Sequence, residues 1–376
     1  MIMRVLHMFT NPHLTNGATM FEYRVSSYLK EKDIFFDYLV TEEAENEELE
    51  RYKSMGSKVY KLPIDNKHGL IIRELKVNVQ YYKFLKKHRY DIVYADTENA
   101  LRSIHLLMAR FAGVPVRVVH SHNTGLQTES RLSKKISRLM RGCFRLSVNN
   151  YFACSDLAAE WLFPKKIYQE RNYKLLTNGV NLEEFEFNRD DRISSRKKLN
   201  INEDELVIGN IGRFMPQKNH VFLVKIFQKI HANNPKSRLL LIGNGPLLDE
   251  IKTLVIDMGL QDVVIFVGTT ADVIKYLQAM DVFLMPSLFE GLPITGIEAQ
   301  ANGLPCIFSD TITKELAITP LAQYCSLKCS ADEWMEVVFN AAQKGRRNCK
   351  QEIIESGYSI LDTVSFLEKF YSKYRR

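Results

Sequence analysis

The stretch Met285–Pro305, MPSLFEGLPITGIEAQANGLP, contains the features that decide the fold class. The apolar residues Val282–Met285 at its start predict a short strand that is buried on both faces, as in a parallel sheet. A turn containing glycine and proline follows. From Ile294 onward the apolar spacing predicts a helix, which Asn302-Gly303 ends. A strand, a turn and a helix in this order predict one βα unit of an α/β protein.

Two carboxylates flank the turn, with Glu290 before it and Glu298 inside the helix. The start of a helix favours anions, because its first backbone N–H groups have no partner within the helix and its dipole is positive there. Seven residues separate the two glutamates, which is not the arrangement of an acid/base pair on one face. We expect them to hold two parts of one elongated ligand, with its phosphates on the amides between them.

This pattern resembles the signature of the retaining glycosyltransferases of family 4. The resemblance is carried by Glu290 within P-S-x-x-E-G-L-P and by Glu298 within E-A-x-A-x-G-x-P, and it extends over nearly the whole chain. It implies the GT-B fold, with two facing Rossmann-like, doubly wound parallel-sheet domains, and a sugar nucleotide as donor. The alternative is a βα loop of another doubly wound protein, with both glutamates simply solvated.

The rest of the chain repeats the alternation of strands and helices. Strands are predicted at residues 2–9, 35–40, 58–62, 91–95, 116–120, 150–154 and 173–180, then at 206–211, 237–242, 263–267, 282–285 and 305–308. Beyond Asp310 the chain is predicted to be mainly helical, ending with a helix over 362–374 that the resemblance places on the first domain. We therefore predict an N-terminal acceptor-side domain of residues 1–180 plus about 358–376, and a C-terminal nucleotide-sugar-binding domain of residues 181–357.

The composition is that of an ordinary globular protein, with 45% hydrophobic and 25% charged residues in 376. No apolar run approaches the ~20 residues that cross a bilayer, and the first residues do not read as a signal peptide. The six cysteines lack metal-binding spacing. We expect reduced thiols and a cytoplasmic protein.

Positive charge is concentrated in the first half of the chain. Residues 1–180 carry 28 Lys and Arg against 19 Asp and Glu, whereas residues 181–376 carry 23 against 25. Two predicted helices, at 70–89 and 131–145, hold much of this charge, and the second is expected to have an opposite apolar face made of Leu132, Ile136, Leu139, Met140 and Phe144. Such a helix binds an anionic membrane surface, or it is an ordinary solvated helix face. The first reading predicts a peripheral position at the inner face of the plasma membrane. No nucleic-acid partner is expected, because no nucleic-acid-binding motif accompanies the charge.

Two residues of the first domain are candidates for the site. Gly17 follows the first strand, in a loop where the resemblance implies a Gly-Gly pair; here Ala18 takes the second place. A glycine there lets the backbone approach a phosphate or sugar, and the alternative is a turn without function. His122 follows the strand at 116–120, and ligands of parallel sheets lie beyond the carboxyl ends of strands. It is a candidate contact of the donor sugar, or else a structural histidine.

The second domain supplies most of the predicted site. Arg213 and Lys218 share the strand-end loop 212–219, where two cations can neutralise a diphosphate, the role that the resemblance implies for them. The alternative is a solvated surface. The resemblance places Gly268 at the base pocket, and Asn244 lies in a Gly-x-Gly turn that is a weak nucleotide signal by itself. The remaining predicted donor-binding residues are Leu292, Pro293, Ile294, Thr295, Gly296, Ile297 and Glu298.

The resemblance implies transfer of a hexosyl or N-acetylhexosaminyl group from a UDP-sugar to a saccharide acceptor, with retention at the anomeric carbon. Arg213, Lys218, Glu290 and His122 are the predicted catalytic set, with the first two and the helix amides stabilising the leaving diphosphate. We expect no metal and no other cofactor, because no Asp-x-Asp motif occurs and fixed cations can replace a divalent ion. A front-face reaction is expected, in which the departing phosphate takes the acceptor proton.

Charge and analogy favour a polyprenyl-diphosphate-linked saccharide as acceptor, as in capsular or exopolysaccharide synthesis. Three other functions remain open: a phosphorylase of the same fold, which would need a lysine-bound cofactor; a sugar-nucleotide epimerase, which would need no acceptor; and a non-catalytic nucleotide-binding protein. The presence of Arg213, Lys218, Glu290 and Glu298 together argues against the last.

Overall fold

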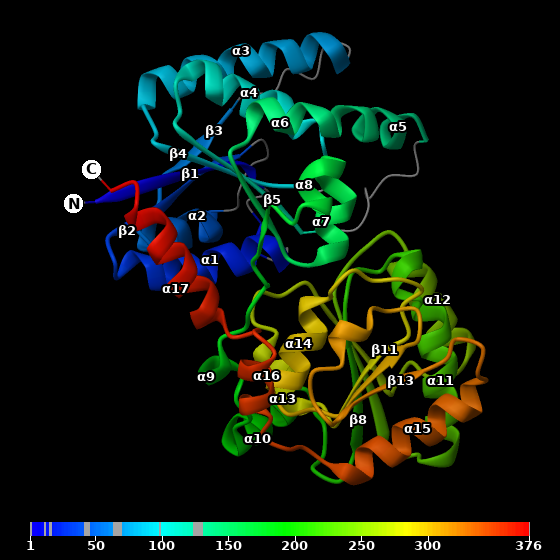
Figure 1. The fold of residues 1–376 in the computed structure, drawn as a ribbon. Helices are drawn as coiled ribbons and strands as arrows, with labels where there is room; N and C mark the ends of the chain where they lie inside the picture. Colours follow the sequence, from blue (N-terminus) through cyan, green and yellow to red (C-terminus); the bar gives the residue numbers. More distant parts are fainter. Residues whose placement is uncertain are drawn as a thin grey trace. The chain divides into compact units, whose positions relative to one another are not determined.

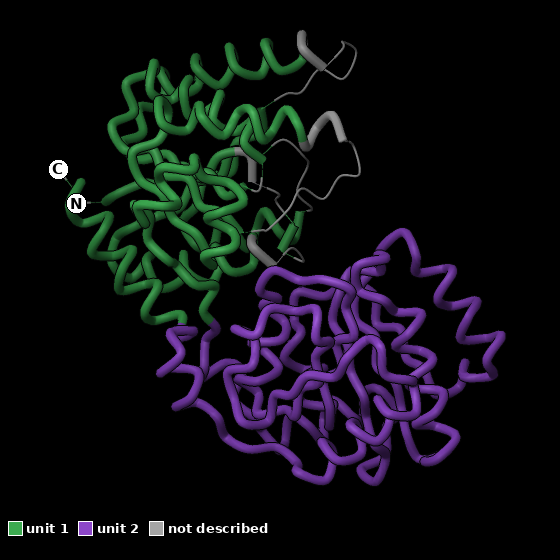
Figure 2. Tube along the Cα trace, turned by 45° about the vertical axis from the view of Figure 1, so that its right-hand side comes forward, with its two compact units in different colours: residues 1–179, 360–376 green, residues 180–359 purple. Residues whose placement is uncertain are grey.

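The structure is a computed structural model that describes residues 2–10, 13–14, 17–40, 46–62, 70–97, 99–122 and 131–375. For residues 9–10, 17–18, 70–72 and 131–134 it describes the backbone alone. The chain forms two compact units (Figure 2). Unit 1 comprises Met1–Gly179 and Ile360–Arg376, and unit 2 comprises Val180–Ser359.

Unit 1 contains a parallel sheet of seven strands in the order β3-β2-β1-β4-β5-β6-β7. The strands are β1 (Met3–Thr10), β2 (Ile34–Val40), β3 (Val59–Lys61), β4 (Ile92–Asp96), β5 (Val116–Ser121), β6 (Asn150–Ala153) and β7 (Lys174–Leu175). Successive side chains of a strand point to opposite faces, and β1 has apolar residues on both. Both faces of the sheet therefore need to be covered by other elements. The strand order reverses between β1 and β4, the position where doubly wound sheets bind ligands.

Helices cover both faces of this sheet (Figure 1). Leu6 and Met8 lie in a core with residues of α3, α4, α6 and α7, whereas Val5 and His7 face the side of α1 and α17. The helices of unit 1 are α1 (Gly17–Lys30), α2 (Asn46–Ser54), α3 (Leu70–His88), α4 (Arg102–Ala112), α5 (Arg131–Met140), α6 (Phe144–Ser147), α7 (Asp156–Leu162), α8 (Lys165–Gln169) and α17 (Ile360–Ser372), and η1 (Arg141–Cys143) joins α5 to α6.

The last helix, α17, joins unit 1 through aromatic packing. The rings of Phe366 and Phe370 lie 5.5 Å and 5.2 Å from the ring of Phe152 on β6, measured between centroids, and Tyr371 lies 6.0 Å from Phe36 on β2. Tyr371 is fully buried. A segment separated from unit 1 by the whole of unit 2 in sequence therefore completes the core of unit 1.

Unit 2 contains a parallel sheet of six strands in the order β10-β9-β8-β11-β12-β13. The strands are β8 (Leu206–Ile211), β9 (Ser237–Ile242), β10 (Val264–Gly268), β11 (Val282–Met285), β12 (Cys306–Ser309) and β13 (Ala322–Cys325). One face packs on α11 (His220–Asn233), α12 (Leu248–Asp257) and α15 (Ala331–Lys344), and the other on α9 (Leu182–Phe185), α13 (Ile274–Ala279), α14 (Ile294–Ala301) and α16 (Lys350–Glu355). The helix α10 (Arg189–Lys198) precedes β8 and packs beside α13.

The predicted α/β class and the two parallel-sheet domains of the GT-B type are confirmed, and two local predictions are wrong. The region after Asp310 is mainly helical, as predicted, and it also contains a short strand, β13, whose residues are mostly half-exposed and so lack an apolar run. The strand predicted at 173–180 is limited to the two exposed residues of β7, at the sheet edge. The helix predicted over 131–145 is divided into α5, η1 and α6.

The apolar face predicted for that helix is only partly buried. Phe144 is fully buried and Met140 packs on the core, but Leu139 is 82% exposed and Ile136 is 41% exposed. The side chain of Leu132 lies outside the described residues. The periodicity of a helix shows where an apolar stripe lies, but it does not show whether another element covers it.

All six cysteines lie in the described part of the chain, and none forms a disulfide. Among the described residues, no helix is both long and apolar enough to cross a membrane.

Candidate active site

Two loops of unit 2 lie at the reversal of its strand order. β8 and β11 are neighbours in the sheet although three α-helices, one 3-10 helix and two strands separate them in sequence. Residues 212–219 follow β8, and residues 286–293 follow β11 and lead into α14. Both loops leave the carboxyl ends of adjacent parallel strands, which places them where doubly wound sheets bind ligands.

These two loops are joined by an ion pair and by hydrogen bonds. Lys218 Nζ lies 2.6 Å from Glu290 Oε1. Gln217 Nε2 donates to Glu290 Oε2 at 3.0 Å and to the carbonyl of Phe289 at 2.9 Å. Asn219 Nδ2 donates to the carbonyl of Pro286 at 3.1 Å. The charged groups of Lys218 and Glu290 are therefore held by both loops.

The Lys218–Glu290 pair is poorly exposed: the side chains are 15% and 8% exposed, respectively. Charges removed from water need a partner, which each provides to the other in this structure. A ligand that carries both a phosphate and hydroxyl groups can replace each side chain as the partner of the other. Its phosphate oxygens would accept hydrogen bonds from the Lys218 ammonium, and its hydroxyl groups would donate to the Glu290 carboxylate.

Close backbone packing holds the loop after β8 against the loop after β9. A Cβ on Gly243 would lie 2.1 Å from the carbonyl oxygen of Gly212, and a Cβ on Gly245 would lie 2.5 Å from that of Phe214. The amide of Phe214 donates to the carbonyl of Asn244 at 3.0 Å. Glycines allow this approach, because any larger residue would overlap the neighbouring backbone.

Arg213 lies on this loop with an exposed side chain. Its guanidinium makes no hydrogen bond or ion pair with the described residues, so it is available to a ligand. Asn244 is also exposed, and its Oδ1 accepts from the amide of Gly245 at 2.7 Å. Gly268, at the end of β10, accepts a hydrogen bond from the amide of Gly243 at 2.9 Å. The structure thus brings the Asn244 turn beside Gly268.

The predicted donor-binding residues at α14 differ in what their side chains do. Pro293 is the N-cap, and no side chain of the described residues caps this helix, so its first amides are open to a ligand. Ile297 is fully buried in the core, and a Cβ on Gly296 would lie 3.0 Å from Leu316 Cδ1. Glu298 is 4% exposed. Leu292 and Ile294 are partly buried against the same core, and Thr295 is half-buried. A ligand therefore meets mainly the backbone of this segment.

In unit 1, His122 follows β5 and is held by a carboxylate. His122 Nε2 lies 2.6 Å from Asp96 Oδ1, at the end of the adjacent strand β4. Asp96 Oδ1 also lies 3.4 Å from His120 Nδ1, which Tyr94 Oη contacts at 2.8 Å. Since Asp96 and His120 are register partners in the sheet, their side chains meet at the strand ends.

A second histidine and a glutamate extend this cluster inward. His7 Nδ1 of β1 lies 3.0 Å from Glu22 Oε2 of α1 and 3.5 Å from Asp96 Oδ2. We call His7, Glu22, Asp96, His120 and His122 the strand-end cluster. It lies at the β1/β4 reversal of unit 1. Its carboxyl and imidazole groups have the composition of a metal site, and in this structure they bind one another through hydrogen bonds and ion pairs.

The pKa values of the cluster indicate how its charges are shared. Burial alone would lower the pKa of His7, but Glu22 and then Asp96 outweigh it and raise that pKa to about 9. Burial and the charge of Asp96 raise the pKa of Glu22 well above its usual range. Hydrogen bonds from its neighbours hold the pKa of Asp96 well below its usual range in spite of burial. Burial and the neighbouring His122 lower the pKa of His120 to about 4. A charged Asp96 thus holds its histidines in place.

Gly17 is the first residue of α1. Residues 11, 12, 15 and 16 of its loop lie outside the described residues, so the predicted role of this loop remains a prediction. His122 and Gly17 belong to unit 1, whereas all other predicted site residues belong to unit 2. Sequence reasoning missed Asp96, His7 and Glu22. Asp96 could have been predicted as His122 was, because it also lies at the carboxyl end of a strand. His7 and Glu22 could not, because their positions in the cluster depend on sheet pairing and helix packing.

Two family models match this chain. Residues 15–184 match the model described as Glycosyltransferase Family 4, and residues 191–322 match the model described as Glycosyl transferases group 1. EpsF of Bacillus subtilis (strain 168), described as a glycosyltransferase, is 32% identical over 98% of this chain and 96% of that protein. The chain belongs to glycosyltransferase family 4.

Further similarities agree with this family. The Escherichia coli UDP-Gal:alpha-D-GlcNAc-diphosphoundecaprenol alpha-1,3-galactosyltransferase is 31% identical over 64% of this chain and 63% of that protein. The crystal structure of Anabaena HepE in complex with UDP and glucose superposes with a TM-score of 0.78, covering 99% of this chain and 100% of that chain at 14% identity. The superposition with HepE shows the GT-B fold. This family 4 chain is a glycosyltransferase of the GT-B type.

Proposed function

We propose that this glycosyltransferase moves a hexosyl or N-acetylhexosaminyl group from a UDP-sugar to a saccharide acceptor carried on a lipid diphosphate, with retention at the anomeric carbon. The observation that carries the proposal is the Lys218–Glu290 pair at the strand reversal of unit 2, beside the uncapped start of α14. The name of the Escherichia coli relative supports a UDP-sugar donor and a lipid-diphosphate acceptor, and the HepE complexes support UDP-glucose binding by this fold.

In this proposal, cationic and backbone groups bind the leaving diphosphate. Lys218, Arg213 and the first amides of α14 neutralise the charge that develops as the glycosidic bond breaks. Glu290 accepts hydrogen bonds from hexose hydroxyls, and Glu298 from the ribose. Fixed cations perform the neutralisation that a divalent ion performs elsewhere, so transfer is expected without a metal. The acceptor hydroxyl oxygen bonds to the anomeric carbon on the face from which the diphosphate departs, and the departing phosphate takes the hydroxyl proton. Attack and departure on the same face give retention.

The acceptor is expected at unit 1, where His122 and the basic helices α3 and α5 lie. His122, held by Asp96, contacts a hydroxyl of the donor hexose in this proposal. The charge of these helices supports a proposed position at the inner face of the plasma membrane, and the proposed pathway is capsular or exopolysaccharide synthesis.

The test is hydrolysis of the donor in the absence of an acceptor. UDP-, GDP- and ADP-sugars are incubated with the wild type and with Glu290→Gln and Arg213→Gln, each with and without EDTA. The control variant is Lys236→Gln, which removes an exposed cation of unit 2 from a surface pair with Asp204. We expect slow release of UDP from one UDP-sugar, insensitive to EDTA, unchanged in the control and lost in both site variants.

Any other outcome would contradict a specific part of the proposal. Release of GDP or ADP would replace the UDP donor, and loss of release in EDTA would contradict metal independence. Formation of a second UDP-sugar from the first would identify an epimerase, and release of a sugar phosphate with inorganic phosphate present would identify a phosphorylase. If no nucleotide or nucleotide sugar binds the wild type, the proposal fails.

A further inference from the structure

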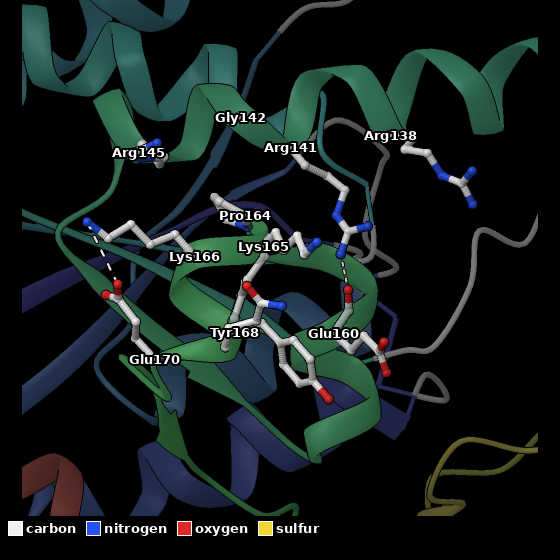
Figure 3. A pocket seen from close by; sticks show the side chains of 12 residues that line it. Arg138, Arg141, Gly142, Arg145, Glu160, Pro164, Lys165, Lys166, Tyr168 and Glu170 are labelled. Atoms are coloured by element: carbon white, nitrogen blue, oxygen red, sulfur yellow. Dashed lines mark hydrogen bonds and ion pairs between the residues drawn. The ribbon is translucent and has the colours of Figure 1, made fainter.

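A basic pocket lies in unit 1. Its lining residues include none of the strand-end cluster and none of the residues predicted to bind the donor. It is formed by α5, η1 and α6 on one side and by α7 and α8 on the other, and its volume is about 820 Å³ (Figure 3). Five cationic side chains and two carboxylates line it. The cations are Arg138, Arg141, Arg145, Lys165 and Lys166, and the carboxylates are Glu160 and Glu170.

Most of this positive charge is uncompensated. Lys166 lies 3.7 Å from Glu170, which neutralises one cation. Arg141 donates to the backbone carbonyl of Glu160, which carries no charge. Burial and the neighbouring Arg138 lower the pKa of Arg141, so these guanidinium groups repel each other. Arg138, Arg145 and Lys165 form no ion pair with the described residues. An anion in the pocket would relieve this repulsion.

The geometry suits phosphate better than a single carboxylate. Figure 3 shows Arg141 on η1 and Arg145 on α6 along one wall, with Lys165 and Lys166 of α8 along the other. Guanidinium groups present paired donors that match phosphate oxygens. Several cations on opposite walls can share the oxygens of one phosphate or diphosphate group.

Exposed apolar side chains lie on α5 and α6, the helices that carry Arg138 and Arg145, although these apolar residues do not line the pocket itself. Leu139 on α5 is 82% exposed, Leu146 on α6 is 61% exposed and Ile136 is 41% exposed. A free phosphate ion has no apolar part that could contact these side chains. A lipid carries a phosphate and an acyl or prenyl chain in one molecule. Cations beside exposed leucines are the combination by which protein segments hold anionic lipid at a membrane surface.

We propose that this pocket binds the phosphate-bearing head group of a membrane lipid, with the leucines of α5 and α6 in contact with the apolar part. The class includes anionic phospholipids and polyprenyl diphosphates. The second source rests on the proposed function, which requires a lipid-diphosphate acceptor at unit 1.

The test measures binding of the full chain to vesicles by flotation. Three vesicle types are used: phosphatidylcholine alone, phosphatidylcholine with phosphatidylglycerol, and phosphatidylcholine with undecaprenyl diphosphate. Saturating UDP is present throughout, to occupy the donor site of unit 2. The pocket variant is R138Q/R145Q, in which both replaced side chains are exposed in the wild type. The matched control is K197Q/K198Q, which removes two exposed cations from α10 of unit 2.

We expect the wild type to bind one or both phosphate-bearing vesicles and the pocket variant to bind them roughly 10- to 25-fold more weakly, about fivefold for each cation at an anionic surface. The control should bind like the wild type. Glu160→Gln, which removes a carboxylate from the pocket, should bind more tightly. A larger loss with undecaprenyl diphosphate than with phosphatidylglycerol identifies the acceptor lipid as the source, and equal losses identify bulk phospholipid.

Two results would overturn the proposal. One is equal binding by the pocket variant and the control. The other comes from Leu139→Ser with inorganic pyrophosphate as probe: if this variant leaves vesicle binding unchanged while R138Q/R145Q weakens pyrophosphate binding, the pocket takes phosphate without lipid. UDP-sugar hydrolysis by R138Q/R145Q is expected to equal that of the wild type. Absence of hydrolysis in the wild type would reject the proposed function, whereas the vesicle results would still decide the pocket.

Discussion

At the scale of single residues, the Lys218–Glu290 pair connects stability with activity. Each side chain is nearly buried and each compensates the charge of the other. Removal of one partner leaves an uncompensated charge in a poorly solvated place, which costs more than the pair itself contributes. The same two groups are the proposed contacts of the diphosphate and the hexose, so their effects on folding and on turnover must be separated.

We predict that Lys218→Met lowers donor hydrolysis by about 100- to 1000-fold, as expected for loss of a group that stabilises developing charge. The same change should lower the free energy of unfolding by about 1–3 kcal/mol, because Glu290 loses its partner. The double variant Lys218→Met/Glu290→Leu should recover much of the stability and none of the activity. Hydrolysis rates and denaturant unfolding of the single and double variants measure both. Recovery of activity in the double variant would contradict the proposed roles.

Asp96 is a positioning residue for His122 in this structure. Its Oδ1 lies 2.6 Å from His122 Nε2, so replacement by an amide changes which ring nitrogen carries the proton. We predict that Asp96→Asn lowers kcat for the UDP-sugar by roughly 10- to 100-fold and leaves the Kd for UDP unchanged, because UDP itself is proposed to bind in unit 2. Kinetics with the donor, and calorimetry with UDP, give this split. A weakened Kd for UDP would show a general structural defect instead.

At the scale of elements, the loops of unit 2 depend on close backbone packing. We predict that Gly245→Ala destabilises the protein by about 1–3 kcal/mol, because its Cβ would lie 2.5 Å from the backbone oxygen of Phe214. The matched control is Gly142→Ala, where nothing lies within 4 Å of the new Cβ and the backbone is not left-handed. This control should be neutral or slightly stabilising. Thermal unfolding of both variants tests the packing.

We predict that His220, the first residue of α11, makes unit 2 sensitive to acid. Burial and then the charge of Lys218 lower the pKa of His220 to about 4, and its ring stacks on Phe214 at 4.1 Å between centroids. In the unfolded chain this histidine takes up a proton near pH 6.5, whereas in the folded protein it does so only near pH 4. The stability it permits at neutral pH is therefore lost as pH falls from about 6.5 to 4.

We predict that His220→Phe, which keeps a ring against Phe214 but cannot titrate, makes the protein less acid-sensitive. The free energy of unfolding of the wild type should fall relative to the variant by about 1–3 kcal/mol between pH 7 and pH 4, from ~1.4 kcal/mol for each unit of pKa difference. Urea unfolding at several pH values gives the comparison. A constant difference over this range would show that His220 does not contribute.

At the scale of the whole molecule, the chain passes from unit 1 to unit 2 and returns, and α17 fills the core of unit 1. We predict that deletion of residues 360–376 unfolds unit 1 while unit 2 stays folded, because Phe36 and Phe152 lose their aromatic partners. Saturating UDP should raise the melting temperature of the remaining transition, since binding to the folded state stabilises it. Calorimetry with and without UDP shows both effects. Loss of the UDP-stabilised transition would contradict independent folding of unit 2.

Much of the fold could be predicted from the sequence, because its main signals are local. Apolar runs identify the strands at 206–211, 237–242 and 282–285 with the same bounds that the structure shows. Gly303 ends α14 as expected, with a φ of 73°. Such strands are buried on both faces and read as continuous apolar segments, whereas β7 and β13 lie at the sheet edges and lack that signal.

The sequence by itself determined the α/β class, the strand-end loops and the family, because a motif and the loop that holds it are continuous in the chain. Tertiary structure decided which groups meet. The contact of Lys218 with Glu290 depends on β8 and β11 being neighbours, and the contact of His7 with Asp96 depends on the pairing of β1 with β4. The exposure of Leu139 depends on the absence of a covering element among the described residues. Pairing between distant segments and the burial of a helix face arise from packing of the whole chain, which no local pattern contains.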